Sequence, residues 1–257
     1  MIDGTARLRS VLVLTTVLLV VSPVGIGAVG AATDDATETA RTVAEIEAHL
    51  QTSVELVAAG DRELAAAHAQ TVVDEQWPVI APQLEAQNAS LAADLETAVE
   101  QVPAAARNDS PDTYEQFVET EILATLPAAS AAVVPADRAD NASFSAGVVA
   151  GLLERASAEY TEGVTENGSV TVAMDYRTAV AYADQAEQRY ESTIAGGLDE
   201  GARNELAEMF DTLDTRLNQS AGPSDIQSIA GSIEGELAEY TGFETERSAD
   251  TAVIERI

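Results

Sequence analysis

The stretch DRELAAAHAQTVVDEQWPVIAPQLEAQNASLAADLETAVEQV, residues 61–102, decides the fold. It is rich in alanine, which has the highest helix propensity, and its larger apolar residues recur at helical spacing. Asp61 predicts a helix start. Pro78 and Pro82 predict a break, because proline lacks a backbone N–H and disfavours helix at the residue before it. The stretch therefore predicts a kinked helical hairpin that is interrupted at Trp77-Pro78.

The same helical spacing runs through the rest of the chain. No segment alternates polar and apolar residues as a half-buried strand does. The apolar fraction is 46% but only 4% of residues are aromatic, which favours close helix–helix contact over a core of large side chains. The predicted fold is all-α, a bundle of about seven or eight helices. We expect helices over residues 34–59, 61–76, 83–102, 111–126, 143–165, 173–196, 199–217 and 223–240.

Residues 61–102 have a diverged counterpart 114 positions later in the chain. This offset aligns Glu45 with Glu159 and His68 with Tyr182. A chance alignment between two alanine-rich amphipathic helices is the alternative explanation. A true duplication predicts two three-helix units, packed into one bundle or into two adjacent ones.

Composition suggests where these units begin and end. The first helical unit is expected over residues 33–126 and the second over residues 143–241. Residues 127–142, rich in alanine and proline, are the expected linker, and residues 242–257 are expected to form a loose acidic tail.

Residues 1–32 have the features of a signal peptide. Arg7 and Arg9 precede the apolar run VLVLTTVLLVV, residues 11–21, which is shorter than the roughly 20 residues that span a bilayer. Small residues before Ala32 offer a cleavage site. An uncleaved N-terminal anchor is the alternative. Both interpretations place the protein outside the cell or at the cell surface.

The charge is strongly one-sided. The formal net charge is −31, from 44 acidic and 13 basic residues, and every basic residue is arginine. This balance resembles that of proteins from extremely halophilic archaea. Nucleic acid is not an expected partner, because nothing neutralises its phosphates. The chain has no cysteine, which excludes disulfides, thiolate metal sites and a cysteine nucleophile.

Five Asn-x-Ser triplets follow the apolar segment, and each is a potential glycosylation acceptor in an exported chain. They begin at Asn88, Asn108, Asn141, Asn167 and Asn218.

His68 and Glu75 fall on one face of their predicted helix, and inward-facing histidine and carboxylate side chains form the metal sites of helical bundles. The two are about two turns apart, roughly 10 Å, so both could bind one ion only with ligands from a neighbouring helix. The usual Glu-x-x-His pattern is absent. A buried, hydrogen-bonded His68 is therefore the favoured interpretation.

Glu45 and His49 are one helical turn apart and form a second candidate pair. They could share an ion, but a solvated surface pair is the favoured interpretation. The chain contains no zinc-protease motif, serine-hydrolase elbow or phosphate-binding glycine loop, so we expect it not to be an enzyme.

Three segments carry a family resemblance: GVVAGLLERASAEYTEGV at residues 147–164, DYRTAVAYADQAEQRYESTI at 175–194 and AAAHAQTVVDEQWPVI at 65–80. They resemble an extracytoplasmic helical domain of unknown function from halophilic archaea. That domain occurs alone or beside blue-copper domains, and it is distantly similar to the helical domain that accompanies high-affinity iron permeases.

The resemblance implies iron or copper as the metal, and a membrane permease or a blue-copper protein as the partner. The chain lacks a copper-binding Cys/His/Met set and the Glu-rich spans of a permease, so neither electron transfer nor permeation is expected. The implied function is a secreted, salt-adapted, non-enzymatic helical binding module at the cell surface. The alternative is a structural or partner-packing glycoprotein with no ligand.

Overall fold

The computed structural model describes residues 31–139 and 141–243, and within these ranges the chain is almost entirely helical. The described residues form no strand, and only one isolated bridge, between Val164 and Val170, pairs extended backbone. The all-α prediction is therefore confirmed. The signal segment, apart from the first residues of the first helix, and the tail beyond Phe243 lie outside the described residues.

The first half of the fold begins with a long helix that ends at Gly60, whose φ of +90° suits glycine. As expected, Asp61 and Ser110 cap the helices that follow them, and Pro111 occupies the first turn after Ser110. The elements are α1 (Ala31–Ala59), α2 (Arg62–Thr71), the π-helical η1 (Val72–Gln76), α3 (Trp77–Asn108), α4 (Pro111–Phe117), the π-helical η2 (Val118–Leu123) and α5 (Leu126–Val133).

The helical hairpin of residues 61–102 turns at a different place from the one predicted. The helix continues through Trp77-Pro78, because the wide turn of η1 already replaces the normal bonding pattern there and Pro78 falls in the first turn of α3. The break lies at Asn88, with φ −152° and ψ 81°. The Asn88 side chain accepts a hydrogen bond from the Leu91 backbone N–H at 3.2 Å and caps the returning segment.

The second half, after a short first helix, also places two α-helices before a π-helical turn. Its elements are α6 (Ala136–Ala139), α7 (Ala142–Gly163), α8 (Ala173–Arg189), the π-helical η3 (Tyr190–Ile194), the 3-10 turn η4 (Ala195–Gly197), α9 (Glu200–Asn218) and α10 (Pro223–Thr241). In each half, four long helical segments are present rather than the three expected per unit. The expected linker, residues 127–142, is largely helical, because most of α5 and all of α6 lie within it.

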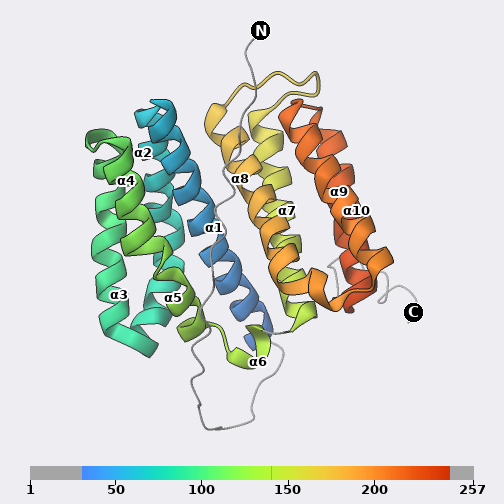
Figure 1. The fold of residues 1–257 in the computed structure, drawn as a ribbon, viewed down its shortest axis with the longest axis horizontal. Coiled ribbons are helices and arrows are strands. Elements are labelled where there is room, and N and C mark those ends of the chain that lie inside the picture. Colours follow the sequence, from blue (N-terminus) through green and yellow to red (C-terminus); the bar gives the residue numbers. More distant parts are fainter. Residues whose placement is uncertain (1–30, 140, 244–257) are drawn as a thin grey trace.

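The two halves lie side by side, with α1 to α5 on one side and α7 to α10 on the other (Figure 1). α1 lies at the boundary and contributes to both cores. Its larger apolar residues, Val43, Ile46 and Leu50, pack in the first core. Its alanines, spaced every fourth residue, pack in the second core: Ala36, Ala40, Ala44 and Ala48. Such a stripe of small side chains allows a neighbouring helix to approach closely.

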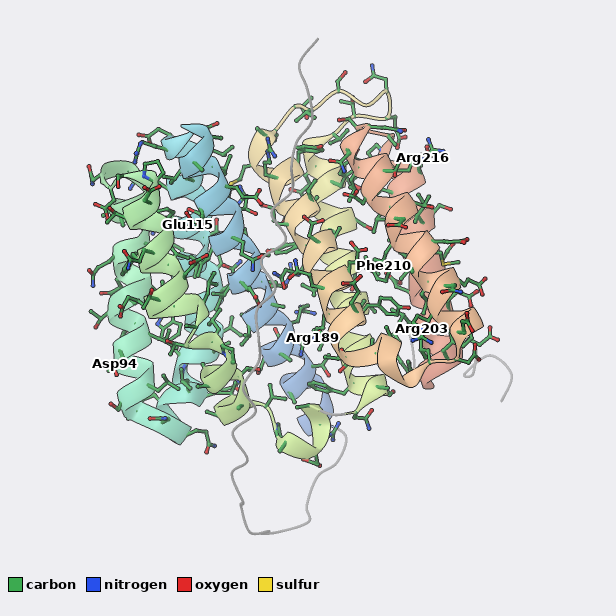
Figure 2. All side chains as sticks on the ribbon, viewed as in Figure 1. Asp94, Glu115, Arg189, Arg203, Phe210 and Arg216 are labelled. Atoms are coloured by element: carbon green, nitrogen blue, oxygen red, sulfur yellow. The ribbon has the colours of Figure 1, made fainter. Side chains whose placement is uncertain are left out.

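Buried tyrosines organise the second core. The Tyr190 and Phe210 rings stack with their centroids 5.2 Å apart, and the Tyr190 hydroxyl donates to the Arg203 carbonyl at 3.0 Å. Phe210 points into this half, whereas Asp94 and Glu115 project outward from the other (Figure 2). No helix in the described ranges is both long and apolar enough to cross a membrane.

Candidate functional site

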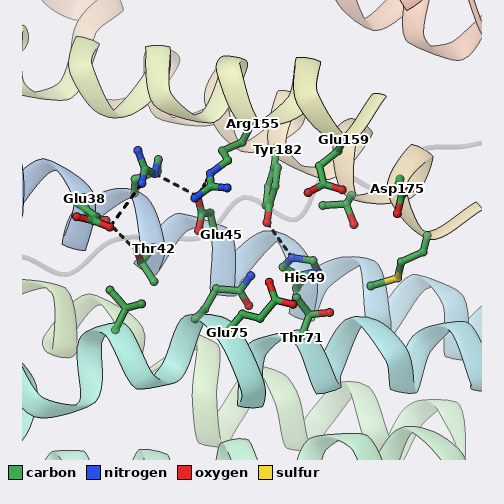
Figure 3. Close-up of a pocket in the computed structure, with 15 residues that line it drawn as sticks. Glu38, Thr42, Glu45, His49, Thr71, Glu75, Arg155, Glu159, Asp175 and Tyr182 are labelled. Carbon is green, nitrogen blue, oxygen red and sulfur yellow. Dashed lines mark hydrogen bonds and ion pairs between the residues drawn. The ribbon is translucent and has the colours of Figure 1, made fainter. Parts of the chain in front are cut away.

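A pocket of about 270 Å³ lies where the two halves meet. α1, η1 and the start of α3 supply one side, and α7 and α8 supply the other (Figure 3). Five carboxylates and two guanidinium groups line it, so negative charge is in excess. These charged residues are Glu38, Arg41, Glu45, Glu75, Arg155, Glu159 and Asp175.

A buried chain of three side chains forms part of the inner wall. His49 Nδ1 lies 3.0 Å from His68 Nδ1, and His49 Nε2 lies 2.9 Å from the Tyr182 hydroxyl. His49 and Tyr182 line the pocket, whereas His68 is fully buried behind them. These three hydrogen-bonded side chains come from α1, α2 and α8, and they therefore link the first half to the second.

His68 is at the end of this group of three side chains, and its Nε2 atom indicates where the hydrogens lie. His68 Nε2 is buried without a hydrogen-bond partner among the described residues. A buried N–H without an acceptor is rarer in folded proteins than an acceptor without a donor, so Nε2 carries the lone pair and Nδ1 the hydrogen. His68 then donates to His49, and His49 donates to the Tyr182 oxygen. With this assignment, the Tyr182 hydroxyl hydrogen is not used within the group of three side chains.

Glu45 is the most enclosed carboxylate of the pocket, with only 8% of its side chain exposed. Arg41 Nε lies 3.2 Å and Arg155 Nε 3.6 Å from Glu45 Oε1. The Arg41 N–H is not aligned for a hydrogen bond, so this contact is an ion pair. Burial raises the pKa of Glu45, although both arginines act to lower it. Both guanidinium groups of the pocket thus contact Glu45, and Arg41 Nη2 also lies 4.0 Å from Glu38 Oε1.

At Glu159 the compensation is weaker, because only Arg155 acts to lower its pKa. Burial, followed by the negative charges of Asp175 and Glu162, raises the pKa of Glu159 to about 7. Burial and Glu162 also raise the pKa of Asp175. In Figure 3 the Glu159 and Glu75 carboxylates lie on either side of the hydrogen bond between Tyr182 and His49. This end of the pocket therefore gathers carboxylates whose mutual repulsion Arg155 only partly offsets.

The structure rearranges the two metal pairs suggested by the sequence. His68 and Glu75 are not brought together as a site, because His68 is buried and Glu75 is exposed and lines the pocket. The expectation that Glu45 and His49 form a solvated surface pair was wrong, since these residues are only 6% and 2% exposed. His49 instead bonds to His68, across two helices. His68 is buried and hydrogen-bonded, which is the interpretation that the sequence favoured.

The sequence reasoning missed Arg41, Arg155 and Tyr182 as members of the site. For Arg41 and Arg155, the internal repeat of the sequence contained an indication. Arg41 and Glu45 are separated by three residues, and the same spacing recurs 114 positions later at Arg155 and Glu159. Both copies line the same pocket, so residues at equivalent positions in the two halves face each other across it.

The donor set is oxygen-rich and suits a hard cation, although the described residues include no group of three or more His, Asp or Glu side chains positioned to hold a metal ion directly. One buried neutral oxygen also lacks a partner among the described residues. Gln76 lines the pocket, is 5% exposed, and its Oε1 atom accepts no hydrogen bond. The lining thus combines five carboxylates with two guanidinium groups that contact Glu45.

All five potential glycosylation residues are exposed. Asn88 and Asn141 cap helices through their side-chain oxygens, and Asn167 lies in the turn before α8. Asn108 and Asn218 end α3 and α9. Each side chain is therefore at an accessible helix end, bend or turn.

Comparison with known proteins identifies a family similarity for part of the chain. No curated protein and no solved structure matches the chain. Residues 135–244 match the family model of the iron permease-associated 4-helix bundle domain, and this range contains α7, α8, α9 and α10. The comparison thus confirms, for the second half of the chain, the predicted likeness to the helical domain that accompanies high-affinity iron permeases.

Proposed function

We propose that the protein is a secreted, non-enzymatic helical module that binds iron at the cell surface and acts beside an iron permease. The observation that carries the proposal is the family match over residues 135–244, which includes α7 and α8, the helices that form one wall of the pocket. The oxygen-rich lining supports iron over copper, because copper sites draw on histidine, cysteine and methionine. The match also favours a permease over a blue-copper protein as the partner.

The pocket supports a binding role because it is built from both halves. α7 and α8 belong to the family-matched range, whereas α1, η1 and α3 do not. Iron bound between Glu159 and Asp175 on one side and Glu75 on the other would therefore bridge the two halves without direct coordination by three side chains of the described residues. Its positive charge would also offset the burial and the neighbouring carboxylates that together raise the pKa of Glu159.

Iron titration of the exported chain in molar KCl tests this proposal. At that ionic strength the Debye length is about 3 Å, so the general attraction of the acidic surface is screened. We expect one ferrous ion per chain under anaerobic conditions, and about tenfold weaker binding by Glu159→Gln. Glu208→Gln is the matched control, because Glu208 is an exposed carboxylate on α9. Absence of iron binding by the wild-type chain would refute the proposal.

The second candidate is a cell-surface glycoprotein with no ligand, and the exposure of all five asparagines favours it. Mass spectrometry of the protein from its own host would detect the glycans. Glycans on the chain together with no bound iron would select this alternative.

A further inference from the structure

The five Asn-x-Ser triplets differ in how far a helix already uses their side chains. A glycosylation acceptor offers its side-chain amide nitrogen, and the serine hydroxyl two residues later, to the same enzyme site. Each residue of a helix is turned by about 100° from the one before it, so residues two apart point to nearly opposite sides. A triplet that forms part of a helix therefore separates the two groups.

Asn108 and Asn218 are the last residues of α3 and α9, and their amide nitrogens are engaged there. Asn108 Nδ2 donates to the Ala104 carbonyl and Asn218 Nδ2 donates to the Asp214 carboxylate, both at 2.7 Å. The Ser110 hydroxyl oxygen of the Asn108 triplet also caps α4. Modification at either asparagine would require these helix-end contacts to break.

Asn88 and Asn141 serve as helix caps. Their side-chain oxygens accept hydrogen bonds from the Leu91 and Phe144 backbone N–H groups, at 3.2 and 3.1 Å. The serine two residues after each asparagine already lies within the helix that follows. Because such a cap stabilises the start of a helix, a glycan at either position would act against the local fold.

Asn167 differs from the other four, because its triplet lies in the loop between α7 and α8, at one end of the second half (Figure 1). Asn167 and Ser169 are both exposed. Asn167 Oδ1 accepts a hydrogen bond from the Thr165 hydroxyl at 2.5 Å, whereas Asn167 Nδ2 and the Ser169 hydroxyl form none with the described residues. Both groups that a glycosylating enzyme uses are therefore available.

The loop holds this triplet in a defined turn. The Gly168 N–H donates to the Thr165 carbonyl at 2.8 Å, and the Thr165 N–H donates to the Ser169 carbonyl at 3.0 Å. Gly168 has a φ of +79°, which suits glycine. Glu166 Oε2 accepts a hydrogen bond from the Ser224 hydroxyl at 3.0 Å, which connects the turn to the start of α10. The folded protein thus presents this acceptor without the unwinding of a helix.

We infer that Asn167 is the principal N-glycosylation acceptor of this chain, and that its co-substrate is a saccharide linked through C1 to a lipid phosphate. Asn167 Nδ2 forms the bond to C1 and the C1–O bond to the phosphate breaks. The phosphate leaves with the bonding electrons, and the amide loses one proton to a base of the transferring enzyme. The inference rests on the export that is part of the proposed function, but not on iron binding. No residue of the triplet lines the pocket between the halves, so iron titration tests the two separately.

Intact glycopeptides, analysed by mass spectrometry, test the inference. The full chain is produced in a host that glycosylates exported proteins, and it is recovered from the medium or the cell surface. We expect the highest glycan occupancy at Asn167. Asn167→Gln and Ser169→Ala should each remove this glycan. Ser169→Thr keeps the hydroxyl and should retain the glycan, and Asn218→Gln should leave it unchanged. Thermal unfolding in molar KCl checks that each variant keeps its fold.

The outcomes distinguish this inference from the proposed function. Higher occupancy at any of the other four asparagines overturns the inference and leaves export and the glycoprotein alternative standing. An exported chain without glycans overturns the inference and that alternative, whereas the iron-binding proposal is decided by the iron titration. An unmodified chain retained inside the cell overturns both the inference and the proposed export.

Discussion

The Nδ1 atoms of His49 and His68 lie 3.0 Å apart inside the bundle. This separation accommodates one hydrogen, since two facing N–H groups or two facing lone pairs would repel. Burial, with the neighbouring His68, lowers the pKa of His49 to about 3. Burial, with Arg177, lowers the pKa of His68 to about 4. Both rings are therefore neutral in the folded protein, and their charged forms oppose folding.

Acid should weaken the fold through this pair. Because both pKa values are below the unfolded value of 6.5, the stabilisation is complete above pH 6.5 and is lost as pH falls toward 4 and 3. The expected slope is about 1.4 kcal/mol per pH unit for each histidine. The difference in unfolding free energy between wild type and His49→Leu/His68→Leu, measured by chemical denaturation, isolates the effect. A difference that stays constant from pH 7 to pH 4 would contradict it.

The two arginines that contact Glu45 should differ in their effect on stability. The Arg41 side chain is 22% exposed and the Arg155 side chain 55% exposed. Arg41→Met should cost about 1–3 kcal/mol, because it removes the closer partner of a buried carboxylate. Arg155→Met should cost less than about 1 kcal/mol, as for a surface ion pair. Urea unfolding in KCl measures both, and equal losses would show that burial does not set the strength of these contacts.

Glu159→Gln should change the pH dependence of stability in the opposite sense to the histidines. The raised pKa means that the folded wild type favours the protonated carboxyl, so the wild type loses stability as pH rises from 4.5 through about 7. The glutamine variant should therefore gain relative to wild type between pH 5 and pH 8, by no more than about 1 kcal/mol after solvent screening. Thermal unfolding of the two proteins across this range provides the measurement, with Glu208→Gln as the control.

Two glycines provide a matched test of packing. A Cβ on Gly163 would lie 2.7 Å from the Tyr176 backbone nitrogen and 3.0 Å from the Val172 carbonyl oxygen, and neither atom belongs to a movable side chain. Gly163→Ala should thus destabilise the fold by about 1–3 kcal/mol. A Cβ on Gly235, inside α10, meets nothing within 4 Å, so Gly235→Ala should stabilise by about 0.5–1 kcal/mol. Losses of similar size at both positions would disprove the packing argument.

Much of the helical architecture could be predicted from the sequence, because capping residues and apolar spacing act locally. Asp61, Ser110 and Asp199 each precede a helix whose backbone they cap. The π-helical turns could not be predicted in this way, since residues of ordinary helix propensity form them. As a result, the sequence predicted the break at Trp77-Pro78, whereas the turn lies at Asn88.

The site was harder to predict, because its contacts join distant parts of the chain. His49 and His68 were identified singly, and each was paired with an acid on its own helix. Their partner across the boundary, Tyr182, is 133 residues from His49. Helical spacing says which residues share a face, but it does not say which faces meet. The repeat of Arg41 and Glu45 at Arg155 and Glu159 was the nearest available indication.

The alanine stripe of α1 has a consequence for how the chain folds as it is made. α1 is synthesised before α7, which begins more than 80 residues after α1 ends. The alanine face of α1 therefore remains uncovered until α7 has been made. A face of Leu or Ile left open for that time would invite association with other chains. Alanine methyl groups expose little apolar surface, so the first half should have little tendency to associate with other chains before α7 packs against it.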